Sequence, residues 1–148
     1  MSGNDENYRK HLELVQLNIA RMAAASFLYK SWVVATVSAL FAAYAASGIE
    51  LLILIAILPV FAFWVLDAFH LATEKGFRTL YEKVRSREIV NFEMKPPPTT
   101  ISNWINAMWT KTLIPLYVPL LFVVIFTYIL FIGDSDGTTG FFQFSFRW

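Results

Sequence analysis

Three side chains able to carry acid–base or metal chemistry share one face of a predicted helix. Asp67, His70 and Glu74 lie at positions i, i+3 and i+7, a spacing that stacks them along one side of a helix. A carboxylate, an imidazole and a second carboxylate in this order can bind a divalent metal or relay protons. The sequence offers no second cluster to complete a closed metal site. We therefore expect no metal and no other cofactor, and interpret the three residues as marking the point at which a helix leaves a membrane.

Other signatures of catalysis are missing from the sequence. The chain has no cysteine, which excludes disulfides, thiolate metal sites and cysteine nucleophiles. Its serines lie in no nucleophile-elbow pattern, and it has no phosphate-binding glycine loop or zinc-binding helix motif. We expect His11 at the surface. The sequence predicts a protein that is not an enzyme, and its net charge of +1 gives no reason to expect direct nucleic-acid binding.

The elements that must position these residues are three uncharged runs. They cover residues 31–49, 51–66 and 113–132 of a 148-residue chain in which 57% of the residues are hydrophobic. About 20 apolar residues cross the hydrocarbon core as a helix, the structure that satisfies its own backbone hydrogen bonds. The sequence predicts an all-α integral membrane protein. A transmembrane helical hairpin at 31–66 is followed by a third transmembrane helix at 113–132.

The basic residues predict the orientation. Segment 1–30 contains four lysines and arginines, the turn between the first two runs none, segment 67–112 seven, and the tail after residue 132 one. Basic segments next to membrane spans stay in the cytoplasm. We therefore expect a multi-pass protein of the cell inner (plasma) membrane, with a cytoplasmic N-terminus, an extracytoplasmic C-terminus and the lipid bilayer as its first partner.

Long helical extensions are expected on the cytoplasmic side of the hairpin. Apolar residues recur at helical spacing over 1–30 and over 67–95, which predicts an amphipathic helix in the first segment and a second cytoplasmic helix in the other. Segment 96–112 opens with three prolines, which predict a linker, and continues as an interfacial helix. In the extracytoplasmic tail, residues 133–148, aromatic and polar residues alternate, as in an extended segment or a short strand.

The short turn at Gly48 predicts which residues of the hairpin face each other. Across an antiparallel pair joined there, facing residue numbers sum to about 97. Lys30 is then expected near Asp67, and Arg21 near Glu74, so that both pairs have complementary charges. In the alternative interpretation all four side chains are simply solvated, because surface ion pairs are weak.

The second run is short for a membrane span. Only 16 residues separate Glu50 from Asp67, whereas a span needs about 20. A carboxylate must therefore approach the hydrocarbon, and ionisable groups at that depth usually face the protein interior or a water-filled path. We place a candidate functional polar site at Lys30, Asp67 and His70.

The first span carries a ridge of small residues at i, i+4 spacing, made up of Ala35, Ala39, Ala43 and Ser47. Small residues let helix backbones approach closely, and this packing drives helix association in lipid. We expect a homo-oligomer assembled through this small-residue ridge. The third run is bulky on all sides, so we expect it to face lipid.

A set of short motifs is scattered over residues 15–85: Asn18 to Ala23, Ser26-Phe27, Lys30 to Trp32, Phe63 to Phe69, Glu74 to Arg78 and Leu80-Tyr81. Together they resemble a family of small bacterial membrane proteins found with antiphage systems. They are similar to the membrane accessory proteins of RNA-targeting CRISPR and RNA-editing adenosine-deaminase defence operons and, more broadly, to two-helix membrane effectors of nucleotide-signalled defence.

The resemblance implies a protein that perturbs or permeabilises the inner membrane, or recruits partners to it, when infection is sensed. From these lines we expect a non-enzymatic, self-assembling accessory or effector protein of antiphage defence. One alternative is a passive anchor or scaffold that recruits a soluble defence protein on the cytoplasmic side. A second alternative is a small transporter or channel subunit, which the absence of an internal repeat disfavours.

Overall fold

The computed structural model of the chain is a bundle of helices. It describes residues 3–86 and 94–135, which form α1 (Gly3–Ser47), α2 (Leu51–Ile55), α3 (Ile57–Arg85), α4 (Ile101–Met108) and α5 (Ile114–Ser135), with no strand in these two ranges. Three stretches are long and apolar enough to cross a membrane: Asp5–Ser47, Leu51–Arg85 and Ile114–Phe131. The predicted all-α architecture with three candidate spans is confirmed.

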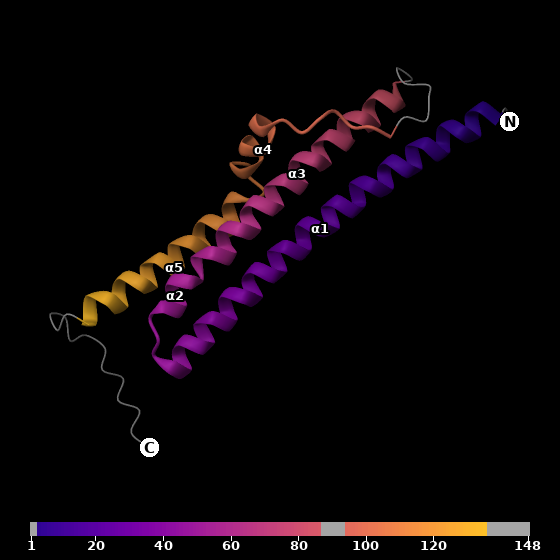
Figure 1. Cartoon of the computed structure of the whole chain (residues 1–148). Coiled ribbons are helices and arrows are strands. Elements are labelled where there is room, and N and C mark those ends of the chain that lie inside the picture. The colour runs from indigo at the N-terminus through magenta and orange to yellow at the C-terminus, as the bar shows by residue number, and fades with distance from the viewer. Residues whose placement is uncertain (1–2, 87–93, 136–148) are drawn as a thin grey trace.

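The long helices α1, α3 and α5 run along one axis, while the short α4 is set at an angle beside α3 (Figure 1). The long α1 runs antiparallel to α2 and α3, and it packs mainly against α3. α4 lies against α3, and α5 returns along α3 and α2 toward the turn that ends α1. In the described part of the chain, α1, α2 and α5 therefore lie side by side near the turn, whereas only α1 and α3 reach the opposite end.

Gly48 ends α1 and makes the tight turn possible. Its φ is +70°, in the left-handed region that a Cβ atom disfavours, and its N–H donates to the carbonyl of Tyr44 at 2.8 Å. The Ser47 hydroxyl donates to Ala43 and accepts the N–H of Ile49. These bonds satisfy backbone groups that the end of a helix otherwise leaves unpaired.

The second apolar stretch is interrupted at Ala56, between α2 and α3. Pro59 has no N–H to donate to the carbonyl of Ile55, and its ring crowds that carbonyl. α2 accordingly ends at Ile55, and α3 starts at Ile57. The uncharged run predicted as one span is thus one apolar stretch made of two helices, α2 and α3, with the break at Ala56 caused by Pro59.

Two apolar clusters hold the bundle together. The span cluster joins all of the longer helices and is centred on the buried residues Val33, Val37, Val60, Trp64 and Tyr117. The outer cluster, Val15, Leu80 and Val84, joins the far ends of α1 and α3. His11, expected at the surface, is only 3% exposed, because it lies one helical turn before Val15 on the same face of α1.

Several predicted boundaries shift. α3 ends at Arg85, short of the predicted 95, and residues 87–93 lie outside the described residues. Residues 94–100 have no regular structure, and Pro96 and Pro97 lie against Gly76 of α3. α5 continues to Ser135, so the first three residues of the predicted tail are helical. The aromatic pattern itself, in residues 136–148, lies outside the described residues.

Gly48 and Gly76 give a matched pair of substitutions with opposite expected signs. Gly48→Ala places a Cβ on a left-handed residue, so we expect it to lower the free energy of unfolding by about 1–2 kcal/mol. Gly76→Ala adds helix propensity, and its new Cβ would meet its nearest neighbours at 3.5 and 3.6 Å, ordinary contacts, so we expect a gain of up to about 1 kcal/mol. Thermal unfolding in detergent, followed by circular dichroism, measures both; a more stable Gly48→Ala variant would contradict the turn.

Candidate functional site

The carboxylate of Asp67 is fully buried and bonded to three other side chains. Its Oδ2 lies 2.7 Å from the Lys30 ammonium and 3.1 Å from the Tyr117 hydroxyl, and the Ser26 hydroxyl donates to its Oδ1. The partners come from α1 and α5, while Asp67 belongs to α3. We call Ser26, Lys30, Asp67 and Tyr117 the Asp67 cluster.

The antiparallel register places the α1 members. Lys30 and Asp67 sum to 97, the predicted value, and the structure confirms that they are neighbours. Ser26 is one helical turn before Lys30 on the same face, so the ammonium also donates to its Oγ at 2.6 Å. The two side chains together cover both oxygens of the carboxylate.

Tyr117 is held by the aromatic residues around it. Its ring stacks on Trp64, with centroids 6.0 Å apart and an interplanar angle of 6°. The Trp64 indole N–H donates to the carbonyl of Met108, and the Trp104 indole N–H donates to that of Val65. These bonds dock α4 and the start of α5 onto α3, and so bring the Tyr117 hydroxyl to Asp67.

His70 and Glu74 do not join Asp67. His70 Nε2 lies 3.0 Å from the Tyr29 hydroxyl, and its buried Nδ1 has no hydrogen-bond partner within residues 3–86 and 94–135. Glu74 points to Arg78. No group of three His, Cys, Asp or Glu side chains in the described part of the chain is arranged to hold a metal ion.

The predicted Arg21–Glu74 pair is wrong. Glu74 is buried, and its Oε1 lies 2.7 Å from Arg78 Nη2 on the same helix, while Arg21 is exposed. An i, i+4 partner is already in place once the helix forms. Arg78 therefore takes the carboxylate that the hairpin register assigned to Arg21.

The small-residue ridge lies on the outside of the chain. Ala35, Ala39, Ala43 and Ser47 are all exposed, whereas α1 buries Val33 and Val37 against the other helices. The bulky third run behaves partly as expected: eight of its large side chains are exposed, but Leu113, Tyr117 and Val124 are fully buried. The ridge thus stays exposed within the part of the chain that the structure describes.

The Asp67 cluster satisfies its own polar groups. Ser26 and Lys30 lie close together, as in a serine–lysine catalytic dyad. The serine proton, however, is donated to Asp67, and an ammonium that is ion-paired with a carboxylate has no lone pair to act as a base. The geometry therefore suits a cluster that holds the three helices together, and whose stability depends on both charges being present. It does not suit the activation of a nucleophile.

Sequence reasoning missed three polar partners: Ser26 and Tyr117 of the Asp67 cluster, and Tyr29, the partner of His70; we call the Asp67 cluster with Tyr29 and His70 the polar layer. Ser26 had a detectable signal, since it is i−4 to Lys30 on the face that the register turns toward Asp67. Tyr29 follows from the same register, because 29 and 70 sum to 99. The only sequence signal for Tyr117 was a hydroxyl group within an apolar run.

Comparison with known proteins adds no template for the site: no protein family model, curated protein or solved structure matches the chain.

Asp67→Asn tests the cluster. The change leaves the Lys30 ammonium without its counter-charge, which in buried pairs costs about 3–5 kcal/mol. Because the lysine side chain is 23% exposed, we expect the lower end, about 3 kcal/mol, in the free energy of unfolding in detergent. Adding Lys30→Met should restore part of that loss, since it removes the unpaired charge.

Glu82→Gln is the matched control, because Glu82 pairs with Arg85 but both are well exposed, and such pairs contribute about 0–1 kcal/mol. Equal effects of Asp67→Asn and Glu82→Gln would contradict a special role for the buried pair. If Asp67→Asn keeps its level and insertion in cells but loses activity, the cluster is functional as well as structural.

Proposed function

We propose that this chain is a non-enzymatic, self-assembling protein of the bacterial inner membrane that perturbs or permeabilises that membrane as an accessory or effector of antiphage defence. The observation that carries the self-assembly is the exposed small-residue ridge. The link to defence rests on the resemblance of residues 15–85.

The Asp67 cluster supports insertion of the hairpin at full depth. A carboxylate paired with an ammonium and bonded to two hydroxyls can lie below the hydrocarbon surface at a much lower cost than an unpaired one. The second span then extends past Asp67 to about residue 70, which gives about 20 residues and about 30 Å. The same register places residues 27–46 of α1 at equal depth. The 16-residue run is therefore long enough once Asp67 is paired.

The small-residue ridge supports association of several copies. Apolar surface alone does not drive helices together in lipid, because lipid tails are equally apolar; close backbone packing does. Alanine and serine at four successive i, i+4 positions allow that packing, and no helix within residues 3–86 and 94–135 covers them. A second copy in the same orientation fits the ridge by parallel packing of α1 on α1.

A polar path through such an assembly would use few groups. Thr36 is partly buried, and Ser47 is exposed at the turn, so hydroxyls of this helix can contribute to a narrow lumen. A lumen of this composition conducts weakly or gates by dewetting. We therefore propose membrane perturbation rather than high conductance.

An anchor or scaffold is the second candidate function, and one observation favours it. Leu14 and Leu17 are 48% and 58% exposed on the α1 extension, beyond the residues at span depth. Exposed leucines one helical turn apart are a typical docking surface for a helix of a soluble partner. This function requires the extension but no path through the membrane.

The orientation is tested with a reporter that is active only outside the cytoplasm. We expect activity when it is fused after Trp148 and none when it is inserted at residue 90, because basic residues cluster in segments 1–30 and 67–112. Activity at residue 90 with silence at the C-terminus would invert the topology. A cytoplasmic reporter at the same two sites is the control.

Ala39→Leu with Ala43→Leu tests assembly and membrane perturbation together. We expect the double variant to shift the protein from oligomer to monomer in mild detergent, because the larger side chains prevent close approach. We also expect overexpression of the wild type to depolarise the membrane, read with a potential-sensitive dye, and the double variant to leave the potential intact. Ala62→Leu, at an exposed alanine of α3, is the matched control and should change neither.

Two outcomes would contradict the proposal. A wild-type protein that is monomeric in mild detergent and in lipid would exclude assembly through the ridge. An intact membrane potential, together with a soluble protein that co-purifies only while Leu14 and Leu17 are present, would favour the anchor.

A further inference from the structure

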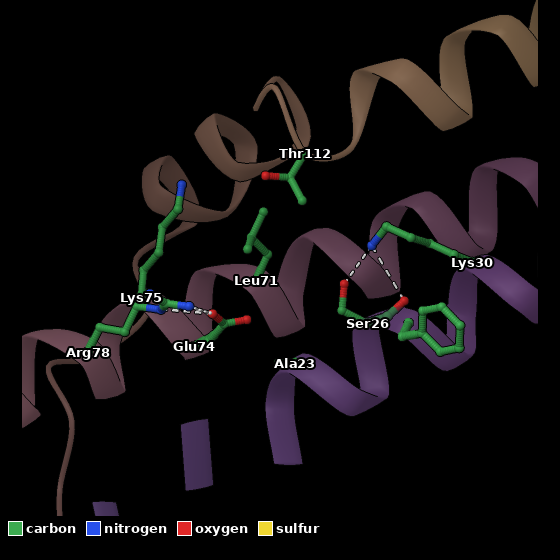
Figure 2. A pocket seen from close by; sticks show the side chains of 9 residues that line it. Ala23, Ser26, Lys30, Leu71, Glu74, Lys75, Arg78 and Thr112 are labelled. Atoms are coloured by element: carbon green, nitrogen blue, oxygen red, sulfur yellow. Dashed lines mark hydrogen bonds and ion pairs between the residues drawn. The ribbon is translucent and has the colours of Figure 1, made fainter. Parts of the chain in front are cut away.

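An open pocket of about 510 Å³ lies between α1, α3 and the residues that precede α5. One end is charged, with Glu74, Lys75 and Arg78 from α3, and the other end contains Ser26 and Lys30 from α1 (Figure 2). Leu71 and Thr112 lie between the two ends. The pocket is therefore an amphipathic surface at the edge of the apolar part of the bundle.

The charges of this pocket do not cancel. Three of the lining residues are cationic (Lys30, Lys75 and Arg78) and one, Glu74, is anionic; with the Asp67 carboxylate that neutralises Lys30 included, the formal balance is 3 − 2 = +1. Glu74 is paired with Arg78, and Lys30 with the buried Asp67 outside the lining. Lys75 is exposed and makes no ion pair among the described residues. Its ammonium is thus available to an anion, together with the remaining guanidinium N–H groups of Arg78 and the exposed hydroxyl of Thr112.

An apolar groove continues from this pocket. A second hollow of about 490 Å³ shares Phe27, Lys30 and Thr112 with the first and adds Ser31, Val34, Pro115 and Leu116. Val34 and Leu116 lie farther along α1 and α5. The groove therefore leads from the basic pocket along the surface between these two helices.

The depth of the pocket matches the headgroup layer of a bilayer. With about 30 Å of hydrocarbon between residues 51 and 70 of the second span, Lys75 lies five residues, or about 7.5 Å, above the hydrocarbon surface. The headgroup region extends about 5–7.5 Å on each side. Phe27 and Ile114 then lie near the hydrocarbon surface, and Val34 and Leu116 lie below it.

We infer that this pocket and groove bind one anionic phospholipid of the leaflet that the basic segments face. The phosphodiester contacts the Lys75 ammonium, the free guanidinium N–H groups of Arg78 and the Thr112 hydroxyl. One acyl chain lies along Phe27, Val34 and Leu116. Basic pockets between helices at this depth bind anionic headgroups. A zwitterionic lipid fits less well, because its own ammonium offsets the phosphate charge and leaves the excess positive charge of the pocket unmatched.

The inference requires insertion in a membrane but neither self-assembly nor permeabilisation. It therefore goes beyond the proposed function, and its failure is distinguishable from failure of that function. Lipid binding is measured on purified protein, whereas the ridge variants are measured by oligomeric state and membrane potential.

The test titrates phosphatidylglycerol and phosphatidylcholine of equal chain length into the purified protein in detergent, with bound lipids counted by native mass spectrometry. We expect the wild type to prefer phosphatidylglycerol. Each basic residue near a headgroup contributes about fivefold in affinity, so Lys75→Glu, a change of two charges, should weaken phosphatidylglycerol binding about 25-fold. Lys83→Glu makes the same change at another exposed lysine of α3 outside the pocket and should leave binding unchanged.

A second pair of variants tests the groove. Val34→Trp fills it and should weaken phosphatidylglycerol binding at least tenfold, whereas Val118→Trp, exposed on α5 outside the groove, should not. Thr112→Val removes the proposed hydroxyl donor without a charge change, and should weaken binding severalfold even if Lys75→Glu fails to fold. Gel filtration and circular dichroism check the fold of each variant.

Three results would overturn the inference. These are equal binding of the two lipids by the wild type, equal loss in Lys75→Glu and Lys83→Glu, and displacement of the lipid by inorganic phosphate at a comparable concentration. The last would indicate a site for a free anion instead of a lipid.

Discussion

The buried carboxylate of Asp67 is the constraint on which the arrangement of the helices depends. A carboxylate with no exposure to solvent must be neutralised or fully bonded, and its partners here come from α1 and α5. Once Lys30 and Ser26 are committed to it, α1 can neither rotate nor slide by a helical turn against α3 without leaving charges unpaired. Once Tyr117 is committed, α5 is fixed as well. One side chain thus sets the relative positions of three helices whose apolar surfaces alone would allow many.

Two apolar clusters with different members lie along the bundle. The span cluster includes contributions from α2, α4 and α5 and continues past Asp67 to Leu71 and Ala72. The outer cluster of Val15, Leu80 and Val84 involves the extensions of α1 and α3. The outward-facing side chains of α1 also differ along its length. Small and aliphatic residues face outward where α1 crosses the apolar zone, whereas charged residues alternate with exposed leucines in the α1 extension.

Much of this architecture could be predicted from the sequence, because hydropathy, turn chemistry and helical register are local properties. Uncharged runs of 19 and 20 residues gave the first and third apolar stretches, and the turn at Gly48 fixed the approach of Lys30 to Asp67. The prediction failed at Glu74 because both Arg21 and Arg78 were possible partners. The hairpin register considers only the partner on the other helix, whereas Glu74 pairs with Arg78 on its own helix. It missed Tyr117 because the position of α5 depends on the indole hydrogen bonds of Trp64 and Trp104, which no sequence periodicity encodes. The role of the polar layer, the assembly and the lipid environment stay predictions.

The continuity of α1 has a mechanical consequence. It is a single helix of 45 residues, about 68 Å long, with no proline and with a glycine only as its first residue, whereas its antiparallel neighbour is jointed at Ala56. A sideways load on the outer ends of α1 and α3 is therefore carried through the apolar zone by α1 as a stiff rod, while the neighbour can bend at the joint. Since Pro59 leaves the carbonyl of Ile55 without its helical donor, the hairpin is expected to bend most easily next to Ala56.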